Sequence, residues 1–146
     1  MRAVVQRVKF SKVSLRNKVL AEIGQGLVVL LGISQSDTEE DIDYIADKIL
    51  NLRVFDDEEG KLNLSVKEIR GEILVVSQFT LYGDCRKGRR PSFVEAAGPE
   101  QAVVFYKKVV EKLTESGLIV KEGKFREKML VEIANDGPVT ILLESK

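Results

Sequence analysis

Apolar and polar residues alternate along the first 23 residues, and this period of two constrains the fold more than any other feature of the chain. Val4, Val8 and Phe10 alternate with polar neighbours, which predicts a strand over residues 1–10. The alternation continues on both sides of Arg16-Asn17-Lys18, where asparagine tolerates the positive φ that a tight turn requires. Residues 11–23 are therefore predicted to form a hairpin.

The remaining pattern predicts further strands and two helices. Residues 27–33 and 73–81 are apolar runs typical of buried strands, and residues 131–133 and 139–143 return to strand-like patterns. Helical periodicity occupies residues 38–51, where Asp37 and Glu40 have the spacing of a capping box, and a second helix is predicted from Pro99 to Gly117. The sequence contains no repeat or linker. We therefore expect one α+β domain over residues 1–146, with a curved, largely antiparallel sheet, barrel-like in its core, and two helices on one side.

Two residue counts exclude whole classes of chemistry. The 146 residues include no histidine and a single cysteine, Cys85. An intrachain disulfide, a zinc site of cysteines and histidines, and Ser-His-Asp or Cys-His catalysis are therefore all impossible. The acidic residues 56–60 lack the alternating spacing of a calcium loop and are better explained as a solvated turn. We expect no metal and no cofactor.

Location and charge restrict the function further. The chain shows neither a signal peptide nor an apolar run long enough to span a membrane, and its single cysteine is typical of a reducing compartment. We therefore expect a cytoplasmic protein without a membrane partner. Its 23 basic and 23 acidic residues cancel, which argues against non-specific nucleic-acid binding. A neutral chain can nevertheless present a basic face to a polyanion.

The first candidate site is Ser77-Gln78-Phe79-Thr80-Leu81, at the end of a predicted buried strand. A strand end holds its groups rigidly, and free backbone N–H groups there can stabilise an oxyanion. The hydroxyls of Ser77 and Thr80 are possible nucleophiles, but each needs a base and the chain has no histidine. The alternative is that these hydroxyls only satisfy backbone groups at the strand end.

Two further segments are candidates for binding. Gly137-Pro138 lies within Asn135-Asp136-Gly137-Pro138-Val139-Thr140; a cis peptide bond there would direct two carbonyls the same way, whereas the residues alone favour a plain turn. A basic loop suits phosphate contacts, although a merely solvated loop is an equally good interpretation. The basic residues of this loop are Arg86, Lys87, Arg89 and Arg90.

Taken together, these segments resemble one family, the D-aminoacyl-tRNA deacylases, first described as D-tyrosyl-tRNA deacylases. The resemblance rests on Met1–Val8, Ser77–Leu81, Arg86–Phe93 and Asn135–Thr140, which occur in order over essentially the whole chain. It implies hydrolysis of the ester of D-aminoacyl-tRNA, as chiral proofreading, with glycyl-tRNA as a further substrate. The alternative is a non-catalytic module that binds the aminoacylated 3′ end of tRNA.

The resemblance also implies roles for individual residues. It implies a homodimer with its active sites at the interface, in which a cis Gly137-Pro138 reaches the partner's pocket and excludes L-residues. Backbone N–H groups near Gln78 and Phe79 would stabilise the oxyanion, and the substrate's ribose 2′-hydroxyl would assist the attacking water. Thr80 would position the substrate, and Arg7 would brace the Gly-Pro segment. Further implied substrate contacts are Phe125 and Met129, and the implied tRNA contacts are Arg86, Lys87, Arg89 and Arg90.

The sequence departs from the family pattern at one place. Members usually carry Phe-Gly-Ala before the methionine that precedes the next strand, whereas this chain has Phe125-Arg126-Glu127-Lys128-Met129. Two large charged residues therefore stand where glycine and alanine are expected, in a loop that borders the bound 3′ end in the family. Arg126 either takes up a phosphate or pairs with Glu127, and the sequence leaves both interpretations open.

Overall fold

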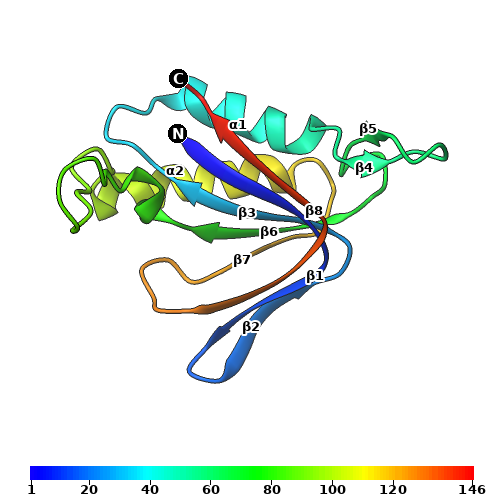
Figure 1. Ribbon diagram of the computed structural model, residues 1–146, viewed down its shortest axis with the longest axis horizontal. Coiled ribbons are helices and arrows are strands. Elements are labelled where there is room, and N and C mark those ends of the chain that lie inside the picture. The colour runs from blue at the N-terminus through cyan, green and yellow to red at the C-terminus, as the bar shows by residue number, and fades with distance from the viewer.

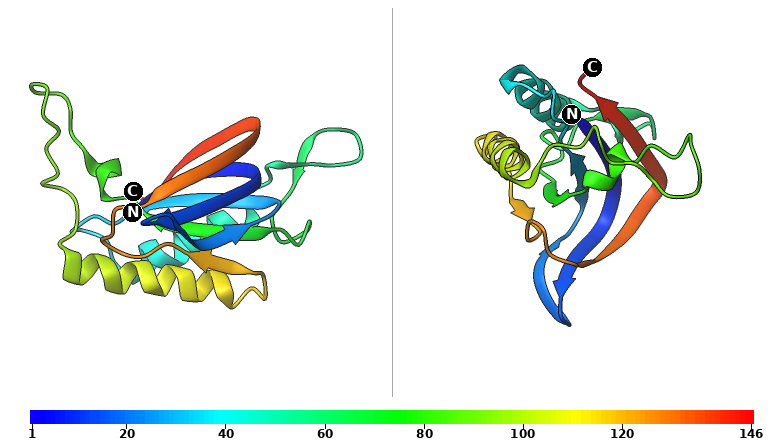
Figure 2. Two further views of the ribbon diagram at one scale, coloured as in Figure 1. Left: turned by 90° about the horizontal axis from the view of Figure 1, so that it is seen from below. Right: turned by 90° about the vertical axis from the view of Figure 1, so that its left-hand side faces the viewer.

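A strongly bent sheet with two helices on one of its faces makes up the structure, a computed structural model that describes all residues 1–146 (Figures 1 and 2). The sheet has six strands, in the order β2 (Lys18–Ile23), β1 (Arg2–Leu15), β3 (Gly26–Gly32), β6 (Glu72–Ser77) and β7 (Val120–Glu122), and β8 (Leu130–Glu144) pairs with the other edge of β1. A small second sheet, β4 (Phe55–Asp56) with β5 (Leu62–Leu64), follows the first helix. None of the helices combines the length and the apolar character that crossing a membrane requires.

The hairpin predicted over residues 11–23 is confirmed with those bounds, and the antiparallel pairing of its first strand continues into a third strand. Strand β1 (Arg2–Leu15) pairs antiparallel with β2 (Lys18–Ile23) and then with β3 (Gly26–Gly32). The pairs Ser11–Ile23 and Val8–Gly26 keep one common register, so β2 and β3 together form one long antiparallel partner of β1. Arg16 and Asn17 both have positive φ, at 48° and 64°, and make the turn where asparagine predicts it.

Strands β6 (Glu72–Ser77) and β7 (Val120–Glu122) make the sheet mixed, because β3 pairs parallel with β6 and β6 pairs parallel with β7. Each of these parallel pairs is joined by a crossover that contains a helix. Strands β3 and β6 are buried on both faces, as their continuous apolar runs predict. The α+β class, the curved sheet and the two helices on one side are confirmed.

Helices α1 (Glu39–Asn51) and α2 (Pro99–Thr114) pack their apolar stripes on the sheet. Most apolar residues of these stripes are buried, for example Ile42, Ile45, Tyr106 and Leu113, whereas Leu50 and Val110 are half-buried. The capping box lies one residue later than expected: Thr38 is the N-cap, and Asp41, not Glu40, accepts its N–H at 2.7 Å. Asp37 instead accepts the N–H of Ser34, also at 2.7 Å.

Two strand boundaries differ from the prediction. The strand expected over residues 73–81 stops at Ser77, and a short 3-10 helix, Phe79–Tyr82, follows it. The break expected at Gly137-Pro138 does not end a strand, because β8 runs without interruption from Leu130 to Glu144. Two register shifts against β1, between Gln6 and Phe10, accommodate the Gly-Pro segment, whose peptide bond is cis.

Candidate active site

The end of β6 opens into a cavity of about 680 Å³, a volume typical of small-molecule sites. Four segments far apart in sequence contribute to its wall: the end of β3, the Ser77–Phe79 segment, the residues around the start of α2, and the loop 125–129. Of the predicted site residues, the structure brings together Ser77, Gln78, Phe79, Phe125 and Met129. The lining is mostly apolar, with charged residues contributed by Arg126, Glu127 and Lys128.

The backbone bend after β6 leaves some N–H groups without a backbone acceptor. The Gln78 N–H is already bonded to the Leu31 carbonyl at 2.8 Å. The next two N–H groups, those of Phe79 and Thr80, have no backbone acceptor because they begin the 3-10 helix. Of the N–H groups expected near Gln78 and Phe79, that of Gln78 is therefore occupied and that of Phe79 is free.

The Thr80 hydroxyl has no base beside it. Thr80 is exposed and does not line the cavity, and its Oγ1 accepts a hydrogen bond from the side-chain amide of Gln78. An amide N–H cannot take a proton from a hydroxyl, so this contact does not activate Thr80 as a nucleophile.

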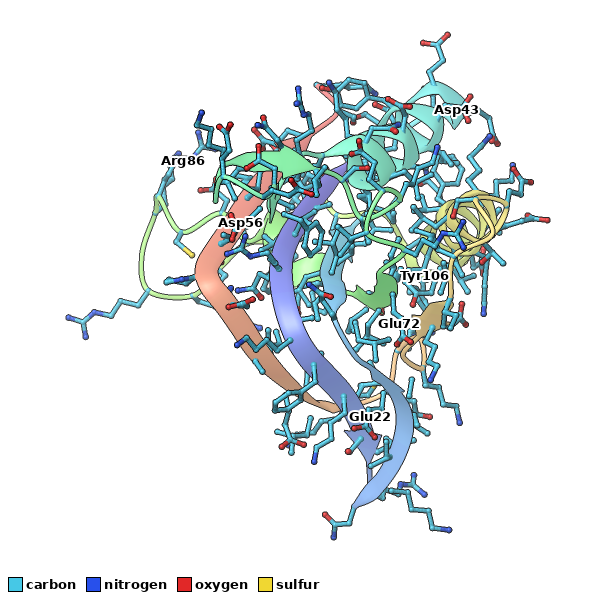
Figure 3. All side chains as sticks on the ribbon, turned by 90° about the vertical axis from the view of Figure 1, so that its right-hand side faces the viewer. Glu22, Asp43, Asp56, Glu72, Arg86 and Tyr106 are labelled. Atoms are coloured by element: carbon cyan, nitrogen blue, oxygen red, sulfur yellow. The ribbon has the colours of Figure 1, made fainter.

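Aromatic side chains form two parts of the cavity wall. Phe79, which is 57% exposed, meets Phe93 edge-on with ring centroids 5.0 Å apart. Deeper in the wall, Phe125 packs on Tyr106 with ring centroids 5.8 Å apart. Tyr106 lies between α2 and β6 (Figure 3) and donates its hydroxyl to the Val75 carbonyl at 2.9 Å. Burial raises the pKa of this phenol, so it remains a protonated donor with a structural role.

The sequence did not single out Phe93, Ala96, Ala102 or Tyr106 as parts of this cavity. Tyr106 and Ala102 lie on the apolar stripe of α2, and the same helical spacing predicts ordinary core residues. Phe93 ends the Arg86–Phe93 segment, which is the only signal in the chain that could have indicated it.

The Gly137-Pro138 segment lies outside this cavity of its own chain. Both residues are exposed in β8, whose outer edge has no partner strand. Arg7, which is 9% exposed, holds the preceding residue: its Nε donates to the Asp136 carbonyl at 2.7 Å. Its Nη1 donates to the Val54 carbonyl at 2.9 Å and lies 3.5 Å from Asp56 Oδ1. The Arg7 guanidinium therefore fixes the backbone that presents Gly137.

The basic loop contains one paired and three unpaired cations. Arg86 extends from the loop (Figure 3) and forms a two-pronged ion pair with Asp84, at 2.8 and 2.7 Å. These hydrogen bonds lower the pKa of Asp84 to about 2. Lys87, Arg89 and Arg90 are exposed and have no acidic partner. The net positive charge of the loop therefore comes from these three residues.

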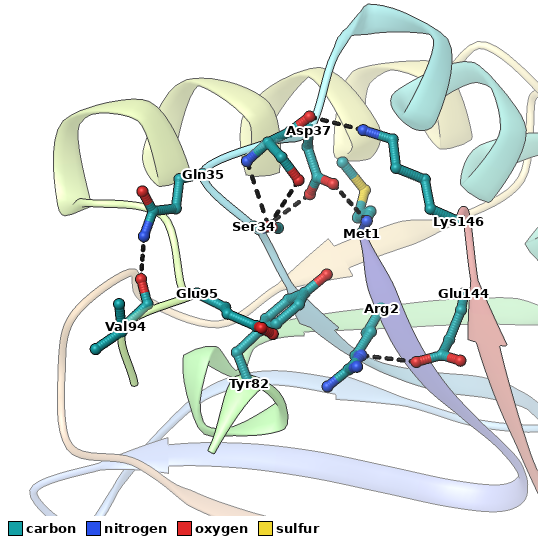
Figure 4. Close-up of a pocket in the computed structure, with 11 residues that line it drawn as sticks. Met1, Arg2, Ser34, Gln35, Asp37, Tyr82, Val94, Glu95, Glu144 and Lys146 are labelled. Atoms are coloured by element: carbon teal, nitrogen blue, oxygen red, sulfur yellow. Dashed lines mark hydrogen bonds and ion pairs between the residues drawn. The ribbon is translucent and has the colours of Figure 1, made fainter. Parts of the chain in front are cut away.

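A second hollow, of about 470 Å³, has a different character (Figure 4). Its polar groups largely pair with one another: the Met1 amino group with Asp37 at 2.5 Å, Arg2 with Glu144 at 2.7 Å, and Lys146 with the Ser36 carbonyl at 2.6 Å. These contacts join the two ends of the chain to the segment between β3 and α1. The polar groups of this hollow therefore have a structural role, because they hold the two chain ends in place. The cavity beside β6 is the candidate active site.

The chain is an α+β protein with two helices on one face of a bent sheet. Its candidate active site has free backbone N–H groups where the central strand β6 ends at an apolar cavity. The model of the D-Tyr-tRNA(Tyr) deacylase family matches residues 4–144, so the chain belongs to that family. A D-aminoacyl-tRNA deacylase of Thermotoga petrophila is 59% identical over 145 residues, which cover 99% of this chain and 97% of the relative.

Two further relatives span the whole chain. A D-aminoacyl-tRNA deacylase of Clostridium botulinum is 61% identical over 146 residues, covering 100% of this chain and 98% of the relative. Among solved structures, the c-Myc DNA unwinding element binding protein superposes with a TM-score of 0.94 at 48% identity, covering 100% of this chain and 99% of that one. Family and fold therefore agree with the resemblance seen in the sequence.

Proposed function

We propose that this protein hydrolyses the ester that joins a D-amino acid to the 3′-terminal adenosine of tRNA. Water adds its oxygen to the ester carbonyl, the acyl–oxygen bond breaks, and the ribose oxygen leaves with a proton as a hydroxyl. The products are a free D-amino acid and tRNA. Full-length identity of about 60% to D-aminoacyl-tRNA deacylases supports the reaction, and it favours a catalyst over a binding module.

One observation carries the proposed mechanism: a free backbone donor, the Phe79 N–H, lies where β6 ends at the cavity, and no side-chain hydroxyl of that segment has a base beside it. The Phe79 N–H, which is free and belongs to a residue that lines the cavity, would stabilise the negative oxygen of the tetrahedral intermediate, and such a donor contributes about 3 kcal/mol in other hydrolases. The substrate's own 2′-hydroxyl would assist the attacking water. The exposed ring of Phe79 and the half-buried ring of Phe93 that meets it offer an apolar surface for the terminal adenine.

We further propose that the catalytic unit is a homodimer. Gly137 and Pro138 are exposed on β8, whose outer edge has no partner strand, and they lie outside the cavity of their own chain, so a second copy would be needed to bring them to a substrate. Exposed Leu130 and Leu142 on the same strand give this region apolar surface suited to an interface. The rigid Gly137 and Pro138 carbonyls would accept the ammonium of a D-residue, while an L-side chain would meet main chain.

Two esters distinguish catalysis from binding. Purified protein is incubated with D-aminoacyl-tRNA and L-aminoacyl-tRNA, and the released amino acid is counted over time. We expect release from the D-ester and none from the L-ester. Glycyl-tRNA should also be hydrolysed, because glycine has no side chain to exclude. Protection of both esters without turnover would instead support a binding module. A tRNA substrate also leads us to expect that the protein acts in the cytoplasm.

Thr80→Ala is expected to keep kcat within about threefold of the wild-type value, because the hydroxyl has no base and does not line the cavity. Loss of a true nucleophile lowers kcat by roughly 10⁴-fold or more. Single-turnover hydrolysis of D-aminoacyl-tRNA measures the difference, with Ser77→Ala as the matched hydroxyl deletion. A loss of several orders of magnitude in either variant would identify a side-chain nucleophile.

Removing the charges of Arg89 and Arg90 together by alanine substitution is expected to weaken tRNA binding several-fold. Each phosphate contact contributes roughly 0.7 to 0.9 to the slope of log K against log salt, so the slope should fall by about 1.5. The control is Lys67→Ala with Arg70→Ala, two exposed cations at the opposite end of β6. Equal affinity and slope in the Arg89/Arg90 variant and the wild type would leave the basic loop without a role in tRNA binding.

A further inference from the structure

Arg126 occupies a backbone conformation that favours glycine. It lies in the loop between β7 and β8 with a φ of +63°, in the left-handed region. Two other arginines, Arg16 and Arg70, also have positive φ, but both lie in turns away from the cavity lining. Arg126 is therefore the one positive-φ arginine that lines the candidate active site.

Contacts within the loop leave the Arg126 guanidinium free. The Lys124 N–H points to Met129 Sδ at 3.1 Å, and the Glu127 N–H bonds to the Lys124 carbonyl at 3.3 Å, so the loop closes on itself. The Glu127 carboxylate pairs with the Lys124 ammonium at 3.7 Å. Arg126 makes no ion pair and no side-chain hydrogen bond, and Lys128 beside it is equally unpaired and exposed.

The chemistry of the substrate decides what this free guanidinium can bind. The amino acid carries a positive ammonium group, which a guanidinium repels, and the adenine is neutral. The only anions near the ester are the phosphodiesters that precede the terminal adenosine. The guanidinium can donate two parallel N–H hydrogen bonds to two oxygens of one phosphate. The Lys128 ammonium adds a second positive charge that attracts the same anion.

We propose that Arg126 binds a phosphodiester next to the terminal adenosine of tRNA and so helps the site select an RNA end over a simple aminoacyl ester. This inference rests on the function proposed above. The Glu127 carboxylate pairs with Lys124 and not with Arg126. The sequence left phosphate binding and pairing with Glu127 as alternatives, and the contacts favour the first.

The variant Arg126→Gly tests this role, because glycine accepts the same φ and removes only the side chain. We expect the KM for D-aminoacyl-tRNA to rise roughly tenfold with kcat unchanged, and the salt slope of binding to fall by about 0.7, the contribution of one contact to single-stranded RNA. With D-aminoacyl-adenosine, which has no phosphate, KM should stay at the wild-type value. Arg126→Lys should restore part of the loss, since it keeps the charge without the two parallel hydrogen bonds.

Arg70→Gly is the matched control, since it removes one exposed positive-φ arginine (φ 51°) at the opposite end of β6. It should change neither KM nor the salt slope. Binding of an RNA minihelix that carries no amino acid, and binding of adenosine, are measured in parallel, so the result does not depend on turnover. Weaker minihelix binding with unchanged adenosine binding supports the inference even if no ester is hydrolysed.

Two outcomes would overturn the inference. An equal rise in KM for the tRNA ester and the adenosine ester would show that Arg126 shapes the pocket for the nucleoside itself. Unchanged minihelix binding and an unchanged salt slope would show that no phosphate contacts Arg126. Neither outcome affects the proposed hydrolysis, which the D- and L-ester assay tests separately.

Discussion

Gly137→Ala is expected to lower deacylation of D-aminoacyl-tRNA by about 100-fold, the scale associated with a displacement of about 1 Å in a catalytic site. Gly137 has a φ of +144°, a conformation that side chains rarely adopt. A Cβ built there would lie 2.8 Å from Val139 Cγ2, 2.9 Å from the Val139 N and 3.0 Å from Arg7 Nη2. The backbone must shift, and the carbonyls proposed to bind the substrate's ammonium shift with it.

Gly24→Ala is the control for this variant, because a Cβ at Gly24 meets nothing within 4 Å. Its activity should equal that of the wild type. Rates are measured with D- and L-esters alike, so a loss of rate and a loss of selectivity are both detected. Wild-type rate and selectivity in Gly137→Ala would contradict the role assigned to the Gly-Pro segment.

Mixing two inactive variants tests whether the site is shared between protomers. Gly137→Ala retains an intact cavity, whereas Ala96→Trp blocks the cavity but retains an intact Gly-Pro segment. In a dimer with one protomer of each variant, one of the two sites combines the intact cavity of the Gly137→Ala protomer with the intact Gly-Pro segment of the Ala96→Trp protomer. Random exchange makes half of the dimers mixed, so about a quarter of the wild-type rate should return. No recovery after exchange, with mixed dimers verified by native mass spectrometry, would contradict sites completed by the partner.

Gly26→Ala is expected to destabilise the fold by about 3 kcal/mol or more, at the upper end of overpacking effects. A Cβ at Gly26 would lie 1.8 Å from the Glu72 carbonyl oxygen and 2.6 Å from the Glu72 N. Both contacts are with the backbone of β6, which cannot rotate away as a side chain can. The parallel β3–β6 pairing must therefore open where it begins, at Gly26–Glu72.

Urea denaturation measures this effect, with Gly24→Ala again as the control, two residues away in the same segment. Gly24→Ala should unfold within about 0.5 kcal/mol of the wild type, as substitutions in open space usually do. An unfolding free energy of Gly26→Ala equal to that of the control would show that β3 and β6 separate without cost. The same pairing aligns Leu31 with Ser77, so the cavity edge should lose order together with stability.

Local periodicity predicted most of the secondary structure, because an element that buries one face has apolar residues at the spacing of that face. The period of two in residues 1–23 predicted the hairpin, and the turn at Asn17 follows from its tolerance of positive φ. The stripe that contains Ile45 predicted the buried face of α1. Each of these features depends on residues close together in the chain.

Boundaries that depend on distant partners were wrong. Apolar Phe79 and Leu81 continue the pattern of β6, so periodicity could not show that the backbone turns into a 3-10 helix after Ser77. Asp37–Glu40 and Thr38–Asp41 have the same capping-box spacing, and the choice is made by Ser34 and the Met1 amino group, which occupy Asp37. Strand β8 continues through Gly137-Pro138 because its pairing with β1 absorbs the irregularity.

The site shows the same division between sequence and structure. By itself, the sequence determined that the chemistry uses neither histidine nor disulfides. It also identified the candidate catalytic and binding segments and the resemblance of the chain to one family. Only the tertiary structure decided that Ser77–Phe79 and Phe125–Met129 share one cavity, that Gly137 lies outside it, and that Glu127 pairs with Lys124 and leaves Arg126 free. The physical reason is that motifs and composition are properties of the chain, whereas a cavity and its unpaired charges exist only where folding brings separate segments together.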